Sequence, residues 1–590
     1  MSDEKRRRRR MSRRTIVRSA PLAIAGATLG AGGTDGQQQP PATSPVTPDD
    51  VSVVAATFGR EFAPAEREQM ARRLTSTRAA PRAIRSAPLS ERDAPALQFD
   101  PVLPGTRLPE GRSRTRTSRG ALPAYDGRPE SLAFASVVEL SRLIRARKVT
   151  ATELTRMYLA RLKRYGPRLA CVVTLTEDLA LAQAARADRE IAAGKYRGPL
   201  HGIPWGAKDI LATRGIPTTW GARPYERQIF DYDATVVARL EAAGAVLVAK
   251  LTTGELAQGD VWFGGVTRNP WRPERGSSGS SAGPGSATAA GLVGFAIGSE
   301  TLGSIVSPSI VNGVTGLRPT FGRVPRTGAM TLCWSMDKIG PMCRAVEDCA
   351  LVLAAIQGPD GQDTTVRDVP FVWDPSAMPL SSLRVGVDVA AFRAIESNAA
   401  VKRIYDDALA VLEKLGLRLR PIPLPARNDA FNALAAFTIM VESATSFTRL
   451  MESGQLALLA RQGDNAWPNT FRVGSVVPAA DYLNAQRVRR QLMEAMARVF
   501  EEVDLYVTIP GVGPSLSYTN LTGHPTVVTR CGEHEGLPRM IEFTGALFRE
   551  AEILRVALAY EQATPWHRRW PDVDRLPEMP PPLGTGEEEE

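Results

Sequence analysis

The sequence predicts an α/β domain with a mixed β-sheet covered by helices. Stretches with apolar residues at helical spacing alternate with short apolar runs, and turn residues separate the two kinds of segment. The chain has 590 residues, which is enough for one large domain or several medium ones. Its composition, with 43% hydrophobic and 23% charged residues, is typical of a globular protein.

The individual elements follow from the spacing of apolar residues from Leu132 onward. We expect helices at 136–147, 152–164, 179–193, 234–243, 399–415 and 551–562. We expect strands at 170–175, 246–250, 383–387 and 505–509. One further helix, at 287–297, is expected inside a stretch rich in Gly and Ser.

The first part of the chain has the layout of an export signal. Residues 1–35 contain a basic run with Arg13 and Arg14, then an apolar stretch at 20–29, then small residues. The paired arginines resemble the twin-arginine signal of bacteria, so we expect a periplasmic or extracellular protein, or a cytoplasmic one if the signal is not used. A disordered basic arm is the alternative. The apolar stretch is shorter than the roughly 20 residues that span a bilayer, so stable membrane insertion is not expected.

Three more regions follow the leader. Residues 36–130 form a Pro/Arg-rich extension, which we expect to be partly disordered, with one or two helices at 48–75 and a linker at 79–120. The main domain is expected at 131–575, and residues 576–590 are expected to be a disordered acidic tail.

Charge and cysteine content exclude several classes of protein. The net charge of +10 comes entirely from residues 1–120, which hold 22 Lys/Arg and 12 Asp/Glu. The main domain is therefore neutral, so we expect no nucleic-acid partner. Five scattered cysteines without a C-x-x-C pair, and only four histidines, predict neither a disulfide framework nor a zinc site.

The most unusual stretch, residues 275–319, places two Gly/Ser loops around the expected small-residue helix. A flexible linker would be polar on both sides, whereas these loops join an apolar segment directly. Small residues let backbone N–H groups approach a substrate closely. No Lys follows the glycines at the spacing of a phosphate-binding loop, so a nucleotide site is not expected.

Two kinds of serine hydrolase compete for this stretch. Residues 279–283 fit G-x-S-x-G, which would make Ser281 the nucleophile of an α/β-hydrolase. That motif requires a strand immediately before it, but residues 271–276 contain Pro and charges. The alternative to a His base is a buried Lys. Lys208 is the candidate, because it lies in the apolar, Gly-containing segment 201–210.

The chain resembles the amidase signature family from about residue 132 to 575. The resemblance rests on GPLHGIPWGAKDI at 198–210, RNPW at 268–271, the Gly/Ser stretch as far as 320, WSMDKIGPM at 334–342, TNLTGHP at 519–525 and residues 560–567. It implies the amidase-signature fold, a large twisted mixed β-sheet core wrapped by helices. It also implies a Ser–Ser–Lys triad that needs no metal and no cofactor.

The resemblance assigns roles to single residues. It implies that Ser304 is the nucleophile, Ser280 the bridging residue and Lys208 the base. It further implies that the Gly279–Ser280 peptide is cis and that Ser281 supports the triad.

The family's oxyanion hole maps onto backbone N–H groups from Thr301 to Ser304. Two positions depart from the family pattern, since Leu302 stands where a Gly is usual and Val306 where an Arg is common. Because the Leu302 side chain lies where the backbone must curl, we expect an altered pocket. Gly303 retains the usual glycine.

The expected function is therefore hydrolysis of a carbon–nitrogen amide bond in a small molecule, giving a carboxylic acid and ammonia or an amine through an acyl-enzyme. One alternative is the A-type component of a glutamyl/aspartyl-tRNA amidotransferase, which would release ammonia from glutamine, although an export leader argues against a cytoplasmic complex. Another is a non-catalytic binding protein on the same scaffold. A homodimer is a further possibility.

Overall fold

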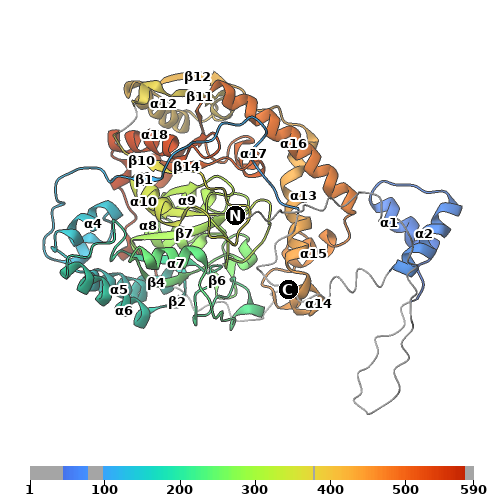
Figure 1. Ribbon diagram of the computed structural model, residues 1–590, viewed down its shortest axis with the longest axis horizontal. Helices are drawn as coiled ribbons and strands as arrows, with labels where there is room; N and C mark the ends of the chain where they lie inside the picture. Colours follow the sequence, from blue (N-terminus) through green and yellow to red (C-terminus); the bar gives the residue numbers. More distant parts are fainter. Residues whose placement is uncertain (1–43, 78–96, 377–378, 579–590) are drawn as a thin grey trace, which may run out of the picture. The chain divides into compact units, whose positions relative to one another are not determined.

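The computed structural model of the chain describes residues 44–77, 97–376 and 379–578 (Figure 1). The chain divides into two compact units, residues 1–87 and 88–590. The leader at 1–35 and residues 579–590 of the tail lie outside the described residues, so the export signal and the disordered tail stay predictions.

The first unit contains two helices, α1 (Pro48–Thr57) and α2 (Pro64–Thr77), in the region where the sequence predicts one or two. Thr47 caps α1, because its side chain accepts a hydrogen bond from the backbone N–H of Asp50, whose carboxylate accepts one in return. The Val46 N–H donates to Thr75 Oγ1 at 2.9 Å, which ties the start of α1 to the end of α2.

Within the described residues, the second unit is built on a mixed sheet of 11 strands in the order β12-β11-β13-β15-β14-β8-β9-β7-β3-β4-β2. The strands are β2 (Val172–Leu175), β3 (Pro204–Lys208), β4 (Val246–Leu251), β7 (Phe295–Glu300), β8 (Thr315–Arg318), β9 (Lys338–Cys343), β11 (Arg384–Asp388), β12 (Arg418–Ile422), β13 (Leu505–Thr508), β14 (Thr526–His534) and β15 (Leu537–Gly545). β3 runs parallel to both β4 and β7, whereas β7 is antiparallel to β9. The predicted mixed sheet is confirmed.

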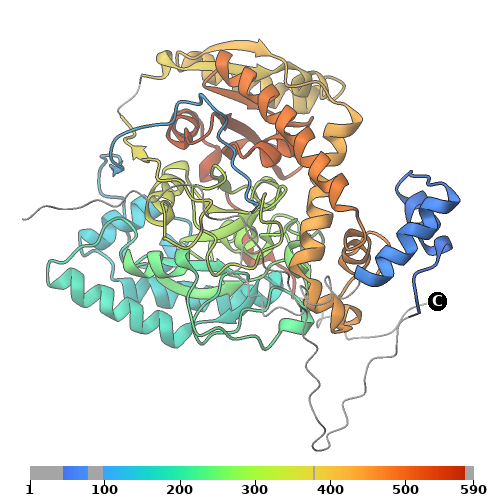
Figure 2. The same ribbon diagram turned by 45° about the vertical axis from the view of Figure 1, so that its right-hand side comes forward.

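Helices wrap this sheet (Figures 1 and 2). They are α4 (Val137–Arg145), α5 (Ala151–Leu169), α6 (Glu177–Ala192), α7 (Thr235–Ala242), α8 (Ala282–Ala289), α9 (Val306–Asn312), α10 (Val346–Ile356), α11 (Val389–Arg393), α12 (Ala399–Lys414), α13 (Asp429–Ser446), α14 (Thr448–Glu452), α15 (Trp467–Gly474), α16 (Ala479–Glu502), α17 (Ser515–Thr522) and α18 (Glu550–Ala563). Strand β4 has a core on each side, because Leu247 packs in one apolar cluster and Val246 and Val248 in another. Helices α13, α15, α16 and α17 pack on one another as a helical group.

The expected helix at 287–297 is wrong. Helix α8 ends at Ala289, and the apolar run that follows it is the strand β7. Gly291, with φ of +65°, lies in the turn between the two elements. A strand that is buried on both faces has a continuous apolar run, which periodicity alone does not distinguish from a buried helix.

Residues 97–120, the described part of the predicted linker, lie on the second unit rather than apart from it. Strand β1 (Arg114–Thr115) pairs in parallel with β10 (Val372–Trp373). Phe99 meets the ring of Phe321 edge-on at 5.0 Å, and the Arg116 guanidinium lies 3.0 Å from the Asp374 carboxylate. This segment is therefore part of the larger unit. None of the helices described here has the length and apolar character needed to cross a bilayer.

Candidate active site

Lys208 is the last residue of β3, and its side chain has no exposed surface. All five residues of β3 are buried between neighbouring strands. Gly206 is required there, because a Cβ at that position would lie 2.3 Å from Cδ1 of Leu251. Since β3 and β7 are parallel, their carboxyl ends meet at the same edge of the sheet, which brings Ser299 of β7 next to Lys208.

Among the described residues, the Lys208 amine contacts hydroxyl and carbonyl groups and no carboxylate. Its Nζ donates to Ser280 Oγ at 2.8 Å, to Ser299 Oγ at 2.9 Å and to the Ser299 carbonyl at 3.4 Å. Burial lowers the pKa of Lys208 to about 7, against the opposing charges of Asp337 and Glu300. A substantial fraction of the amine is therefore neutral at physiological pH, and a neutral amine can accept a proton.

The loop before α8 carries Ser280. The Gly279–Ser280 peptide is cis, as the resemblance implies. A side chain at Gly279 is excluded, because its Cβ would lie 1.8 Å from the Gly259 carbonyl oxygen. The N–H of Ser281 donates to the Ser304 carbonyl at 3.1 Å, and this bond joins the two predicted catalytic loops.

Ser281 has a structural position rather than that of a nucleophile. Its hydroxyl donates to the Ser299 carbonyl and accepts from the Ser299 N–H, each at 3.1 Å, and the residue is fully buried. Residues 267–281 hold no strand, so the α/β-hydrolase alternative lacks its required element. His524 is also buried, its ring is paired with Thr522, and burial lowers its pKa to about 3.

Ser304 follows β7 directly and precedes α9. It is 8% exposed, and its hydroxyl has no hydrogen-bond partner in the part of the chain that the structure describes. Gly303 has φ of +82°, and a Cβ there would lie 2.8 Å from Ser307 Oγ, so the turn requires glycine. The Leu302 side chain packs on an apolar cluster that includes Tyr518, which gives it a place outside the turn. Thr301 donates its hydroxyl to Asp337 at 2.5 Å.

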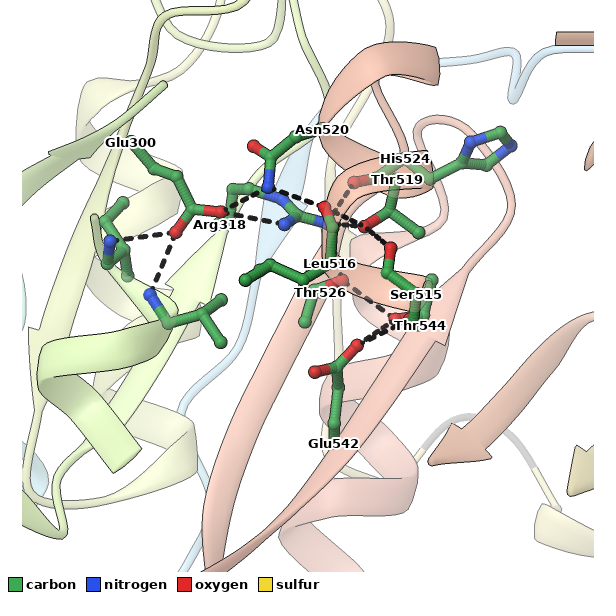
Figure 3. A network of polar contacts seen from close by, with 12 residues as sticks. Glu300, Arg318, Ser515, Leu516, Thr519, Asn520, His524, Thr526, Glu542 and Thr544 are labelled. Atoms are coloured by element: carbon green, nitrogen blue, oxygen red, sulfur yellow. Dashed lines mark hydrogen bonds and ion pairs between the residues drawn. The ribbon is translucent and has the colours of Figure 1, made fainter. Parts of the chain in front are cut away.

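Glu300 organises the Ser304 loop, a role that the sequence analysis missed (Figure 3). One carboxylate oxygen accepts from the N–H groups of Ile305 and Val306, at 2.8 and 2.9 Å. The other accepts from Arg318 and from Asn520, each at 2.8 Å. Burial alone would raise the pKa of Glu300, but the Arg318 charge and these hydrogen bonds outweigh it and lower the pKa to about 2. The anion thus fixes the backbone immediately after Ser304.

The structure places the site residues expected from sequence in one region. Lys208 and Ser280 are in direct contact, and Ser304 joins them through its backbone carbonyl and Ser281. No hydrogen bond joins the hydroxyls of Ser280 and Ser304 among the described residues. Ser299, which the sequence analysis overlooked, is the second hydroxyl partner of Lys208. The described residues include no group of three His, Cys, Asp or Glu side chains placed to hold a metal ion.

Comparison with known proteins identifies the family. A family model described as Amidase matches residues 153–531. The chain belongs to the amidase family. The A-type component of the glutamyl-tRNA(Gln) amidotransferase of Thermosynechococcus vestitus is 34% identical over 485 residues, which cover 74% of this chain and 99% of that protein.

Solved amidase structures share the fold. The native peptide amidase from Stenotrophomonas maltophilia superposes with a TM-score of 0.67 at 31% identity, covering 76% of this chain and 100% of the peptide amidase. A bacterial aryl acylamidase of the amidase signature family has the same fold, with a TM-score of 0.66 at 21% identity, over 76% of this chain and 99% of its own. The expected amidase-signature fold is confirmed, and the chain is an amidase-family enzyme that hydrolyses amide carbon–nitrogen bonds.

Proposed function

We propose that the chain hydrolyses an amide through a Ser304–Ser280–Lys208 triad and an acyl-enzyme. The observation that carries this proposal is a fully buried lysine with a pKa of about 7, hydrogen-bonded to Ser280 rather than to a carboxylate. A lysine that is partly neutral at pH 7 is suited to act as a general base. The hydroxyl of Ser304, at the end of the adjacent strand, is the group that such a base would activate.

The reaction would start with proton transfer. Neutral Lys208 takes the proton of Ser280, which takes the proton of Ser304 as Ser304 Oγ attacks the amide carbon. Collapse of the tetrahedral intermediate breaks the carbon–nitrogen bond, and Ser280 returns a proton to the departing nitrogen. Water then attacks the acyl-enzyme by the same relay, which releases the carboxylic acid and regenerates Ser304.

Backbone N–H groups of the segment from Thr301 to Ser304 would hold the oxyanion. Each donor in a comparable hydrolase stabilises the transition state by about 3–4 kcal/mol. The glycine turn at Gly303 and the Glu300 contacts to Ile305 and Val306 support a preformed loop, because they fix the backbone on both sides of Ser304.

The amide itself distinguishes two candidates. The structural similarity to a peptide amidase supports a small-molecule or peptide amide as the substrate of a free-standing enzyme. The second candidate is an amidotransferase component of the A type that hydrolyses glutamine for a partner. The sequence relatives favour this second candidate, since alignments at 34–35% identity cover 98–99% of the amidotransferase components of Thermosynechococcus vestitus and Methylococcus capsulatus.

The triad is tested by labelling the intact protein with a fluorophosphonate and measuring its mass. We expect one adduct, mapped to Ser304, that is absent in Ser304→Ala and forms far more slowly in Ser280→Ala. A single His→Ala variant that loses labelling as completely as Lys208→Ala would overturn the lysine-base scheme, as would an adduct on another residue.

The substrate is tested separately by measuring ammonia release from glutamine and from a panel of peptide and aryl amides. Release from peptide or aryl amides by the protein alone supports the free-standing amidase. Release from glutamine that increases when a tRNA-binding partner is added supports the amidotransferase role.

A further inference from the structure

Asp337 lies directly before β9 and holds two loops of the site together. Its Oδ1 accepts the hydroxyl of Thr301 at 2.5 Å. Its Oδ2 accepts the backbone N–H groups of Leu332 and Cys333, at 2.8 and 2.9 Å. The carboxyl group therefore links the segment at 332–333 to the first residue of the Ser304 loop.

The hydrogen-bond pattern indicates that Asp337 is ionised. Both oxygens act only as acceptors, and two of the three donors are backbone N–H groups, which cannot accept a proton in return. Burial raises the pKa of Asp337, and the hydrogen bond from Thr301 opposes this shift. No ion pair joins Asp337 to a cation in the described parts of the chain. Its negative charge is therefore not neutralised by direct contact.

Two carboxylates act on the Lys208 amine, and they differ in their own partners. Asp337 is the stronger of the two in its effect, and Glu300 is the other. Glu300 forms an ion pair with Arg318 at 2.8 Å, so much of its charge is compensated. A further charged group, Lys338 on β9, is buried beside Glu300, and burial lowers its pKa well below the usual value. Of the two, Asp337 is the carboxylate without a directly bound cation in the part of the chain described.

The position of Asp337 depends on the helical group. Ser335, two residues earlier, accepts hydrogen bonds from Arg489 of α16 at its Oγ (2.8 Å) and its carbonyl (2.9 Å). The Ser335 hydroxyl donates to Glu442 of α13 at 2.6 Å. The Phe99 ring lies 3.6 Å from the Arg489 guanidinium, so the N-terminal segment covers this contact. These bonds fix the chain immediately before Asp337.

We propose that Asp337 is a positioning residue of the amidase site, which holds the Ser304 loop through Thr301 and places an uncompensated negative charge near the Lys208 amine. This role rests on the proposed triad. It has two separable parts, because the hydrogen bond acts on the geometry of the oxyanion loop and the charge acts on the proton affinity of the base.

The experiment measures the rate of fluorophosphonate labelling of Ser304 from pH 5 to pH 9 in three variants. Asp337→Asn keeps the size and hydrogen-bonding capacity but removes the charge, so we expect the pH midpoint to fall by on the order of half a unit or more. Thr301→Val removes the hydrogen bond but keeps the charge, so the maximal rate should fall roughly tenfold at an unchanged midpoint. Asp178→Asn, an exposed substitution on α6 with the same charge change, should match the wild type in both.

Several outcomes would overturn the proposal. They are a midpoint in Asp337→Asn that is unchanged or higher, and a midpoint that moves as far in Thr301→Val. If Asp337→Asn does not fold, Asp337→Glu provides the second test, with a slower rate expected at the wild-type midpoint; a shifted midpoint there contradicts the charge role. Failure of the triad itself is distinguishable, because the wild-type protein would then not be labelled at Ser304.

Discussion

Two neighbouring strands each bury a lysine, and the surroundings of the two amines differ. Lys250 of β4 lies 3.0 Å from the Asp209 carboxylate and also donates to the hydroxyl of Thr218 at 2.6 Å. Lys208 of β3 has hydroxyl and carbonyl partners but no carboxylate in contact among the residues described. Both side chains have no exposed surface.

The comparison shows that burial by itself does not make a lysine a base. Burial lowers the pKa of both amines, but at Lys250 the adjacent Asp209 opposes the effect through charge and a hydrogen bond. An ion pair in the interior is a structural element, because removing one partner leaves an uncompensated charge. The amine without such a partner is the one that exchanges a proton near pH 7.

Replacing Lys208 tests the comparison most strongly. Lys208→Met should lower kcat/KM by roughly 10³-fold or more, because the base is lost, and should leave the melting temperature near that of the wild type. Lys163→Met, which removes a half-exposed lysine paired with Glu177, is the matched control and should keep full activity. Retained activity in Lys208→Met would contradict the assignment.

Replacing Lys250 should have the opposite result. Lys250→Met leaves the Asp209 carboxylate buried and unpaired, so the free energy of unfolding should fall by roughly 3–5 kcal/mol in urea denaturation. The double variant Lys250→Met with Asp209→Leu should recover part of this loss. A stable Lys250→Met single variant would show that the pair is not structural.

The pH profile sharpens the contrast further. Lys208 is protonated below its pKa of about 7, so kcat/KM should rise with pH through 7 and fall about tenfold per pH unit well below it. Protonated lysine cannot accept the Ser280 proton, which gives this sign. A profile that is flat between pH 6 and 8 would mean that no group with this pKa controls the reaction.

The smallest expected effect is at Thr218. Thr218→Val removes one hydrogen-bond acceptor of Lys250, so the free energy of unfolding should fall by about 1 kcal/mol. The midpoint of the pH profile should not move, because this residue does not contact Lys208. A shift of the midpoint would show that the two lysine sites are coupled.

Local sequence patterns predicted helices well where a polar face and a cap are present. Helix α5 begins after Thr150, whose side chain and Glu153 form reciprocal capping bonds, and it carries apolar residues at helical spacing. The pattern failed at 287–297, where every residue is small or apolar and periodicity carries no information. The residues of the site came from motifs, and the partners that hold them did not.

The sequence alone determined the α/β class, the two Gly/Ser loops and the identity of Lys208, Ser280 and Ser304 as candidates, because these depend on local composition and short motifs. The tertiary structure alone decided that Ser299 meets Lys208, that Glu300 binds Arg318 and Asn520, and that Asp337 binds Thr301. These contacts join residues 18 to 220 positions apart along the chain. The protonation of a lysine depends on such neighbours, because the cost of burying a charge is set by the groups around it and not by the residue itself.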